Sequence, residues 1–419
     1  MSETKKKFSG WAVLVGCILL MIFPGGLLSY TAGLFMYPIC AEYGFTTSTF
    51  SLSLTLAAAV NALTSAFLVQ YLSKGSKGTM KIIMLVSAIV TCGGFACMSL
   101  CTKLWQFFVM SAVWNIGYNM LTYVPVGMFI SNWFVDKRAT MTGIAFAGGN
   151  VGGAIFCTAV SQIMANQGWR TAYVIGGVLC FVFTLIAILL IKRSPAEYGQ
   201  EAYGADKVSS DPASGQKMWM GVDKKTAMKS PAVHLLALTL LFTGIYAAGI
   251  ANYVVTFLCT GGWEITAAGF VMTVFTLFGI AGNVGGGALV GKIGLKKGII
   301  LSGVLIILSL VCLSLSTGIK FLAYVFAALL GLACVLSVLI PSQAVIATFG
   351  LKDFAGIYGY VYAFYLIGCA ISTPLIAFLA EKAGYNIAWL VVGIIVAAII
   401  LMYMRCLAYG KKFHELYPD

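Results

Sequence analysis

The chain has 419 residues, of which 60% are hydrophobic and only 9% carry a charge. A water-soluble surface cannot be built from so few charged residues, so the composition excludes an ordinary soluble protein of two or three domains. The formal net charge of +13 does not indicate nucleic acid as a partner. The basic residues stand in short strips beside long apolar blocks, where they act on membrane topology.

Each apolar block is long enough to cross the hydrocarbon layer of a bilayer, which takes about 20 residues of helix. The first block is too long for a signal peptide, and we expect it to remain as the first span. Six spans are predicted in the first half, at 11–39, 50–72, 80–101, 104–130, 140–165 and 172–191. Six more are predicted in the second half, at 233–259, 266–290, 298–317, 321–348, 354–380 and 386–408.

We therefore expect an all-α integral membrane protein with twelve transmembrane helices in two pseudo-symmetric six-helix bundles. The N-terminal bundle takes residues 1–191 and the C-terminal bundle takes residues 231–419. Residues 192–230 are rich in Ser, Asp, Gly, Pro and Lys, and this composition predicts a hydrophilic cytoplasmic linker. Pro231 suits the first turn of the span that follows.

The basic residues are distributed unevenly over the two sides of these spans. If both termini are cytoplasmic, the inner segments hold 22 of the 26 Lys and Arg residues. The outer turns then hold only Lys103, Arg170, Lys320 and Lys382. The positive-inside rule favours this orientation, and we expect a protein of the cytoplasmic (plasma) membrane with both termini in the cytoplasm.

Two turns of the first half recur in the second half. The run Gly-Trp-Arg-Thr-Ala-Tyr at 168–173 is echoed by Gly-Tyr-Asn-Ile-Ala-Trp at 384–389, an offset of 216 residues. The basic turn that contains Gly75 is echoed by the turn that contains Gly294, an offset of 219 residues. Two turns with nearly the same offset predict a duplicated six-helix unit.

Six plus six spans, a basic central segment and Gly-Lys turns after spans two and eight resemble the major facilitator superfamily over nearly the whole chain. A more specific likeness is the run Asn-Trp-Phe-Val-Asp-Lys-Arg-Ala-Thr-Met-Thr-Gly at 132–143, followed by Gly-Gly-Asn-Val-Gly-Gly at 148–153. This junction of spans four and five is similar to that of the oxalate/formate antiporter and monocarboxylate porter families. The run Ser-Pro-Ala-Glu-Tyr-Gly at 194–199 adds to the resemblance.

Two tyrosines extend this likeness. Tyr30 precedes Pro38 by eight residues, and Tyr123 precedes Trp133 by ten. The resemblance implies that both tyrosines line a central cavity.

The chain also departs from these families. Leu72 and Gly291 stand where turns of the superfamily carry an acid. Asn283 stands where the families carry a substrate-pairing arginine in span eight, and Tyr365 stands where the antiporters carry a lysine in span eleven. Asparagine cannot form the two parallel charge-assisted bonds of an arginine with a carboxylate. A dicarboxylate such as oxalate is therefore not expected.

No Asp, Glu, Lys or Arg lies deep within any predicted span, so we expect no buried carboxylate that loads a proton. Span four instead carries polar residues at offsets of 3, 4, 7 and 8, which trace one helix face. They are Asn115, Tyr118, Asn119, Thr122 and Tyr123. This face either lines a wet cavity that binds a ligand or bonds a neighbouring helix, and both interpretations stay open.

Span eleven repeats tyrosine at Tyr358, Tyr362 and Tyr365. These phenols either line the same cavity or belong to the aromatic belt at the membrane interface. The remaining spans add four candidate substrate-binding residues, namely Asn252, Tyr253, Asn283 and Gln343.

Asp136, Lys137 and Arg138 form a charged turn beside span five. This turn either latches an inward gate through an ion pair or is a solvated topogenic turn. The glycine runs at 148–153 and 282–287 lie in mid-span without the Lys-Ser or Lys-Thr end of a phosphate loop, so we expect close helix packing there. Most of the twelve cysteines lie inside the spans as small apolar residues, and we expect neither a metal nor a cofactor;.

Together these features predict a secondary carrier whose bundles rock about a central site and expose it to each side in turn. The resemblance indicates a small organic solute, in the first place a monocarboxylate, moved alone, with a proton (symport) or against a counter-solute (antiport). The alternative is a carrier or efflux pump for a neutral or amphipathic, drug-like solute. We expect a monomer whose partners are this substrate and the lipid bilayer.

An intramembrane enzyme and a non-transporting sensor are the remaining rivals. A membrane hydrolase needs an acid pair, a Ser-His pair or a metal cluster within the spans. The chain has two histidines in all, His234 and His414. A sensor commonly appends a soluble domain, and the segment at 192–230 is too short for one. We therefore do not expect an enzyme.

Overall fold

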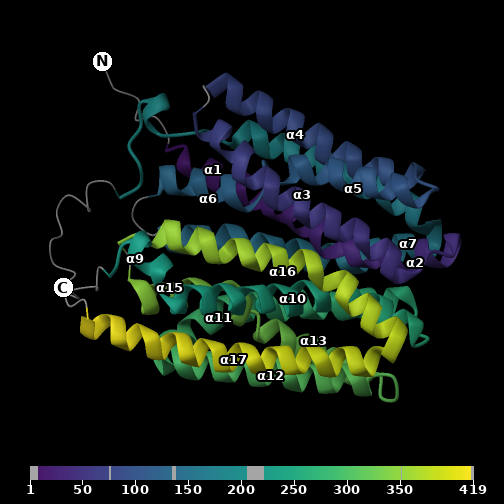
Figure 1. Ribbon diagram of the computed structural model, residues 1–419. Helices are drawn as coiled ribbons and strands as arrows, with labels where there is room; N and C mark the ends of the chain where they lie inside the picture. The colour runs from purple at the N-terminus through teal and green to yellow at the C-terminus, as the bar shows by residue number, and fades with distance from the viewer. Residues whose placement is uncertain (1–7, 75–76, 135–137, 205–220, 351, 417–419) are drawn as a thin grey trace.

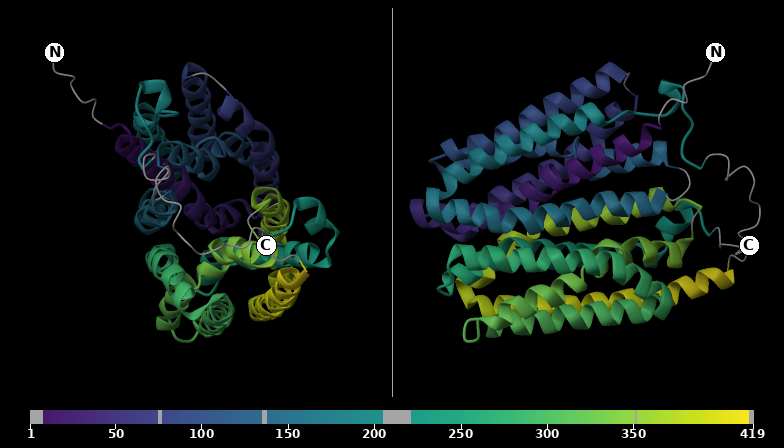
Figure 2. Two further views of the ribbon diagram at one scale, coloured as in Figure 1. Left: turned by 90° about the vertical axis from the view of Figure 1, so that its left-hand side faces the viewer. Right: turned by 180° about the vertical axis from the view of Figure 1, so that it is seen from behind.

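The computed structural model describes residues 8–74, 77–134, 138–204, 221–350 and 352–416. Within these ranges the regular structure is helical, and strand-type pairing is limited to an isolated bridge between Phe134 and Tyr203. The long helices lie alongside one another in two groups, one from each half of the chain (Figure 1). Seen from the end that carries both termini, one group stands above the other (Figure 2, left).

The first half begins with one continuous crossing made of α1 (Gly10–Leu20), the π-helical η1 (Met21–Leu28) and α2 (Ser29–Tyr43). It continues with α3 (Thr47–Lys74), α4 (Lys77–Cys97), η2 (Met98–Leu100), α5 (Leu104–Tyr118) and α6 (Tyr123–Trp133). α7 (Arg138–Leu190) carries two crossings, because the backbone leaves helical geometry at Gly168.

The segment between the halves contains η3 (Ala196–Tyr198) and α9 (Lys224–Lys229). The second half consists of α10 (Pro231–Thr260), α11 (Ile265–Ile293), α12 (Leu295–Leu315), α13 (Phe321–Leu332), α14 (Val335–Val338), α15 (Ile340–Phe349), α16 (Phe354–Ala383) and α17 (Tyr385–Leu416).

The described helices account for the twelve predicted crossings. Nine segments are by themselves long and apolar enough to span a membrane, among the residues that the structure describes. One of these nine, Thr140–Leu190, contains the break at Gly168 and crosses twice. Adding one crossing for α3 and one for the interrupted pair α5 and α6 gives twelve crossings. The predicted all-helical fold is confirmed.

The fourth crossing of each half is interrupted, whereas the sequence predicted continuous spans at 104–130 and 321–348. The first interruption separates α5 from α6, and the second separates α13, α14 and α15. Proline gives the physical reason, because it lacks a backbone N–H and is tolerated in the first turn of a helix. Pro125 lies in the first turn of α6, and Pro341 lies in the first turn of α15.

Glycines bring the first crossing into backbone contact with α7. A Cβ atom on Gly26 of η1 would clash with the backbone of Gly152, and one on Gly152 would overlap the carbonyl oxygen of Ile22. This confirms the close packing expected for the run at 148–153. In the second run, Gly282 packs in the same way against the backbone of Gly331, whereas Gly285 faces open space.

The repeated turns of the two halves share one backbone conformation. Gly168 has φ 83° and ψ 162°, and its counterpart Gly384 has φ 85° and ψ 159°. Side chains of L-residues rarely adopt such φ values, so glycine fits both positions. The sequence repeat therefore corresponds to a repeated turn between consecutive crossings.

The segment predicted as a hydrophilic linker is docked at both of its described ends. The backbone N–H of Tyr203 donates to the carbonyl of Trp133 at 2.8 Å, next to α6. The N–H of Val222 donates to the carbonyl of Phe349 at 2.9 Å, at the end of α15. Backbone groups make these contacts, which is why side-chain composition did not reveal them.

Asp353 fixes α9 beside the start of α16, and Asp223 bonds within the first turn of α9. The backbone N–H of Lys224 donates to Asp353 Oδ2 at 2.8 Å. The hydroxyl of Thr226 donates to Asp223 Oδ1 at 2.6 Å, and this bond lowers the pKa of the Asp223 carboxyl. The end of the linker is thereby attached to the second half.

Replacing Gly384 by alanine should lower the free energy of unfolding by about 1–2 kcal/mol, because a Cβ atom is strained at this φ value. Thermal unfolding of the purified protein in detergent measures the effect as a lower melting temperature. Gly143→Ala is the matched control, since Gly143 lies within α7 and has open space around its Cβ position. Equal melting temperatures for the two variants would contradict the assigned strain.

Candidate functional site

The two groups of helices meet mainly between α7 and α11, between α3 and α16, and between α2 and α10. Thr158 of α7 and Thr273 of α11 share a hydrogen bond between their hydroxyls at 2.8 Å. Gly33 of α2 approaches the backbone of Asn252 in α10 so closely that a Cβ atom would lie 3.0 Å from its carbonyl oxygen. Side chains near these pairs can therefore contact a ligand from both halves.

Tyr30 of α2, which the resemblance predicts to line a central cavity, lies at this interface. Its hydroxyl donates to Asn150 Oδ1 of α7 at 2.7 Å, and the Asn150 side chain is buried. Its ring centroid lies 6.4 Å from that of Phe275 in α11, which belongs to the other half. Asn150 was not among the predicted site residues, because it stands inside a glycine run that was interpreted as packing.

Tyr118 ends α5 and Tyr123 begins α6, on the two sides of the interruption. Tyr118 shares a hydrogen bond with the hydroxyl of Ser29 in α2, and its side chain is buried. Tyr123 is 44% exposed, and its ring packs edge-on against Phe146. The phenol of Tyr123 is close enough to those of Tyr30 and Tyr118 for electrostatic interaction.

The predicted tyrosines of α16 form a stacked series. The ring centroids of Tyr358 and Tyr362 lie 5.5 Å apart, and those of Tyr362 and Tyr365 lie 5.2 Å apart. Tyr362 is 37% exposed and interacts electrostatically with Tyr118 and Tyr123 of the first half. We call Tyr30, Tyr118, Tyr123 and Tyr362 the phenol cluster, since Tyr118 and Tyr123 of the first half lie within electrostatic range of both Tyr30 and Tyr362.

The two asparagines of span four, unlike its tyrosines, bond to neighbouring backbone and to α3. Asn119 donates through Nδ2 to the carbonyl of Asn61 at 2.6 Å and to Thr64 Oγ1 at 2.8 Å, both in α3. Asn115 donates to the carbonyl of Ser111 at 3.0 Å within its own helix. Both asparagines are buried, and these contacts favour the helix-packing interpretation for them.

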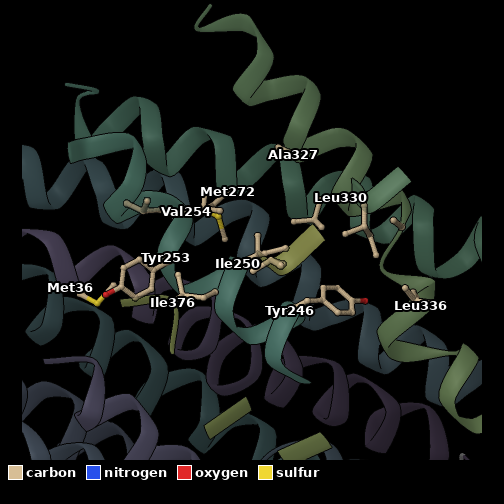
Figure 3. Close-up of a cluster of buried hydrophobic side chains, with 14 of the residues drawn as sticks. Met36, Tyr246, Ile250, Tyr253, Val254, Met272, Ala327, Leu330, Leu336 and Ile376 are labelled. Carbon is tan, nitrogen blue, oxygen red and sulfur yellow. The ribbon is translucent and has the colours of Figure 1, made fainter. Parts of the chain in front are cut away.

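Asn252 and Tyr253 lie on α10 where it packs against α2. Asn252 Nδ2 donates to Thr373 Oγ1 of α16 at 3.1 Å. Tyr253 is fully buried, and its phenol oxygen points toward Met36 of the first half (Figure 3). These two residues therefore form part of the contact between the halves.

No contact with the cluster is recorded for the remaining predicted residues in the described part of the chain. Gln343 is exposed on α15, and Asn283 lies on α11 with a buried Oδ1 that has no hydrogen-bond partner in the described part of the chain. Asp136 and Lys137 of the predicted gate lie outside the described residues. Arg138 begins α7, and its side chain is likewise not described.

A carboxylate clasp joins the two halves at the end of the molecule opposite the termini. Glu381 near the end of α16 accepts hydrogen bonds from the backbone N–H of Ser48 at 2.9 Å, from the Ser48 hydroxyl at 2.8 Å and from the Thr47 hydroxyl at 3.1 Å. Thr47 and Ser48 open α3, where unpaired N–H groups favour a negative charge;. The sequence missed this clasp because Glu381 is more than 330 residues from its partners.

A small cavity of about 40 Å³ lies next to the interface in the second half. Tyr246 of α10, Phe275 of α11, Cys334 at the start of α14 and Ser337 within α14 contribute to its wall. Tyr246 is buried, and its phenol oxygen points away from Tyr253, toward Leu336 (Figure 3). Tyr246 was not among the predicted site residues, because the sequence predicted a continuous tenth span without this cavity.

The comparison with protein families matches the Major Facilitator Superfamily at residues 18–261 and 235–415. The chain belongs to the major facilitator superfamily. Members of this superfamily are transporters of small solutes and not enzymes, so the protein is an integral membrane transporter.

Individual relatives of this superfamily transporter are distant. It is 29% identical to the uncharacterized transporter ESBP6 of Saccharomyces cerevisiae over 44% of its own length, and the match covers only 28% of that relative. It is 22% identical to monocarboxylate transporter 12 of Mus musculus, over 80% of this chain and 74% of the mouse protein. A crystal structure of the D323A mutant of the nucleoside transporter NupG aligns with a TM-score of 0.76 at 13% identity, over 94% of this chain and 99% of that one.

Removing the clasp of the transporter by Glu381→Ala should expose the amide of Ser48 to exchange. A carboxylate at an exposed helix start contributes about 0.3–1 kcal/mol, so we expect deuterium uptake around residues 46–50 to become up to about fivefold faster. Hydrogen–deuterium exchange with mass spectrometry measures this rate. Glu264→Ala is the control, because Glu264 is an exposed acid at the start of α11 with no side-chain capping bond. Unchanged uptake in Glu381→Ala would contradict the clasp.

Asn119→Ala should lower the stability of the transporter by about 0.5–1.5 kcal/mol, because it removes two bonds between α5 and α3. Thermal unfolding measures the change, and equilibrium binding of a ligand should stay unaltered in the folded variant. A ligand affinity that falls while the melting temperature is unchanged would instead assign Asn119 to the binding cavity.

Proposed function

We propose that the chain is a secondary carrier for a small organic monocarboxylate, with bundles at 1–191 and 231–419 that expose a central site alternately. The observation that supports this is the phenol cluster, whose groups come from both halves and meet where the halves touch. A solute bound there contacts both bundles at once, so its binding is coupled to their relative movement.

The choice of a monocarboxylate is supported by the likeness to monocarboxylate transporter 12 and to the monocarboxylate porter runs at 132–143 and 148–153. Among the described residues, no charged side chain belongs to the phenol cluster. A bare carboxylate would lose its hydration there without an ionic partner. We therefore propose that the acid travels with a proton as a neutral molecule, and exchange against a second solute is the alternative.

The proposed orientation places both termini in the cytoplasm of a monomer in the plasma membrane. The clasp at Glu381 then closes the outer side, while the partly exposed Tyr123 and Tyr362 are reached from the inner side. The excess of Lys and Arg on the inner segments supports this arrangement.

A second candidate is a carrier or efflux pump for a neutral or amphipathic solute. It is favoured by the same absence of charge from the cluster, since aromatic rings and neutral hydroxyls suit an uncharged ligand as well as a protonated acid.

Uptake of labelled lactate and pyruvate into proteoliposomes tests the monocarboxylate assignment. The labelled acid is added outside the vesicles. We expect its uptake to rise when this outside solution is more acidic than the vesicle lumen. Tyr123→Phe should reduce uptake by about two- to tenfold, since one hydrogen bond contributes about 0.5–1.5 kcal/mol.

Protein-free liposomes and Tyr409→Phe serve as controls for this assay. Tyr409 is a partly exposed tyrosine of α17 outside the cluster. If neither acid enters faster than in protein-free liposomes, the assignment to a small aliphatic monocarboxylate is wrong.

A further inference from the structure

An aromatic series extends along one face of α16. Phe354, Tyr358, Tyr362 and Tyr365 follow at spacings of four, four and three residues, which place them on neighbouring turns of the same face;. Their ring planes are nearly parallel, at 11°, 28° and 16° for consecutive pairs. We call these four rings the aromatic ladder.

The spacing of the aromatic ladder leaves ring surface uncovered. Its centroids lie 5.2–5.5 Å apart, whereas the stacked pair Phe35 and Tyr173 lies at 3.7 Å. The rings are therefore offset from one another, and each covers only part of its neighbour. Tyr362, in the middle of the ladder, keeps 37% of its surface exposed.

Two phenols of the first half, those of Tyr118 and Tyr123, lie within electrostatic range of Tyr362. Tyr118 is already bonded to Ser29. Within the described part of the chain, no hydrogen bond is recorded for the hydroxyls of Tyr123 and Tyr362, and both side chains are partly exposed. These two hydroxyls are therefore free to bond a ligand.

We infer that the site selects a solute with a flat aromatic ring, which stacks on Tyr362 while its polar end bonds the hydroxyl of Tyr123. This inference rests on the proposed carrier function and narrows its substrate class from small acids in general to aromatic ones. An offset stack favours a planar ring, because a planar ring presents its whole face to the tyrosine whereas a puckered ring touches it with few atoms.

A site that only buries a ligand and a site that stacks on its ring predict different ligand preferences. A site that merely excludes water would bind planar and puckered rings of equal size alike, since burial depends on area and not on shape. A stacking site prefers the planar ring by about three- to tenfold in affinity. The preference should not depend on whether the polar end is an acid or an amide, because both groups bond the Tyr123 hydroxyl.

Equilibrium binding to the purified full-length chain in detergent tests this with two matched pairs of probes. Benzoate is compared with cyclohexanecarboxylate, and benzamide with cyclohexanecarboxamide, with protein-free micelles as the partition control. Tyr362→Phe should keep the planar preference, because the ring remains. Tyr362→Leu should reduce it to about equal binding, whereas Tyr409→Leu should leave it unchanged. Melting temperatures establish that each variant is folded.

The outcomes separate this inference from the proposed function. Planar preference in the amide pair without binding of either acid supports the aromatic site and contradicts the monocarboxylate assignment. Equal binding of planar and puckered acids overturns the aromatic site and leaves the monocarboxylate assignment standing. Absence of binding by all four probes, or a planar preference that survives in Tyr362→Leu, also overturns the inference.

Discussion

The backbone contact between Gly26 of η1 and Gly152 of α7 is the constraint on which the site depends. Neither residue has room for a Cβ atom, so the first and fifth crossings approach as closely as two helices can;. This approach sets the position of Tyr30, four residues after Gly26, against Asn150, two residues before Gly152. Ser29 reaches Tyr118 from the same turn. A side chain at either glycine would separate these pairs.

Interruption of the fourth crossing in each half adds a second constraint. Backbone that leaves helical geometry within a membrane is tolerated where it is buried in protein or lines a cavity. Both interruptions meet this requirement, since the residues of the first, 119–122, are buried and the second borders the cavity near Cys334. Each break redirects the following helix, and the first one places two phenols at the interface where a straight helix would hold them on one continuous stripe.

Charge is confined to the ends of the described helices, and the middle is neutral. Glu42 pairs with Arg170 at 2.7 Å, and Glu381 bonds the start of α3, both at the end opposite the termini. Burying such groups in mid-membrane would cost several kcal/mol each, by general estimates of about 2.5–3.5 kcal/mol per residue. The protein therefore fastens its halves with a carboxylate at the surface and leaves hydroxyls, amides and aromatic rings for the interior.

The sequence by itself determined the number of crossings and the duplicated turn at Gly168 and Gly384, because these depend on local composition and local backbone strain. It also identified Tyr30, Tyr118, Tyr123 and Tyr362 as candidates. It could not distinguish these phenols from Asn115 and Asn119 on the same predicted stripe.

Only the tertiary structure decided which groups bond a neighbouring helix and which face the other half. Asn119 is directed to α3, while Tyr123 is directed to the interface after the break. Asn150 and Glu381 gained their roles from partners 120 and 333 residues away. The physical reason is that a polar side chain in a membrane takes the nearest available partner, and that partner is fixed by how distant helices pack.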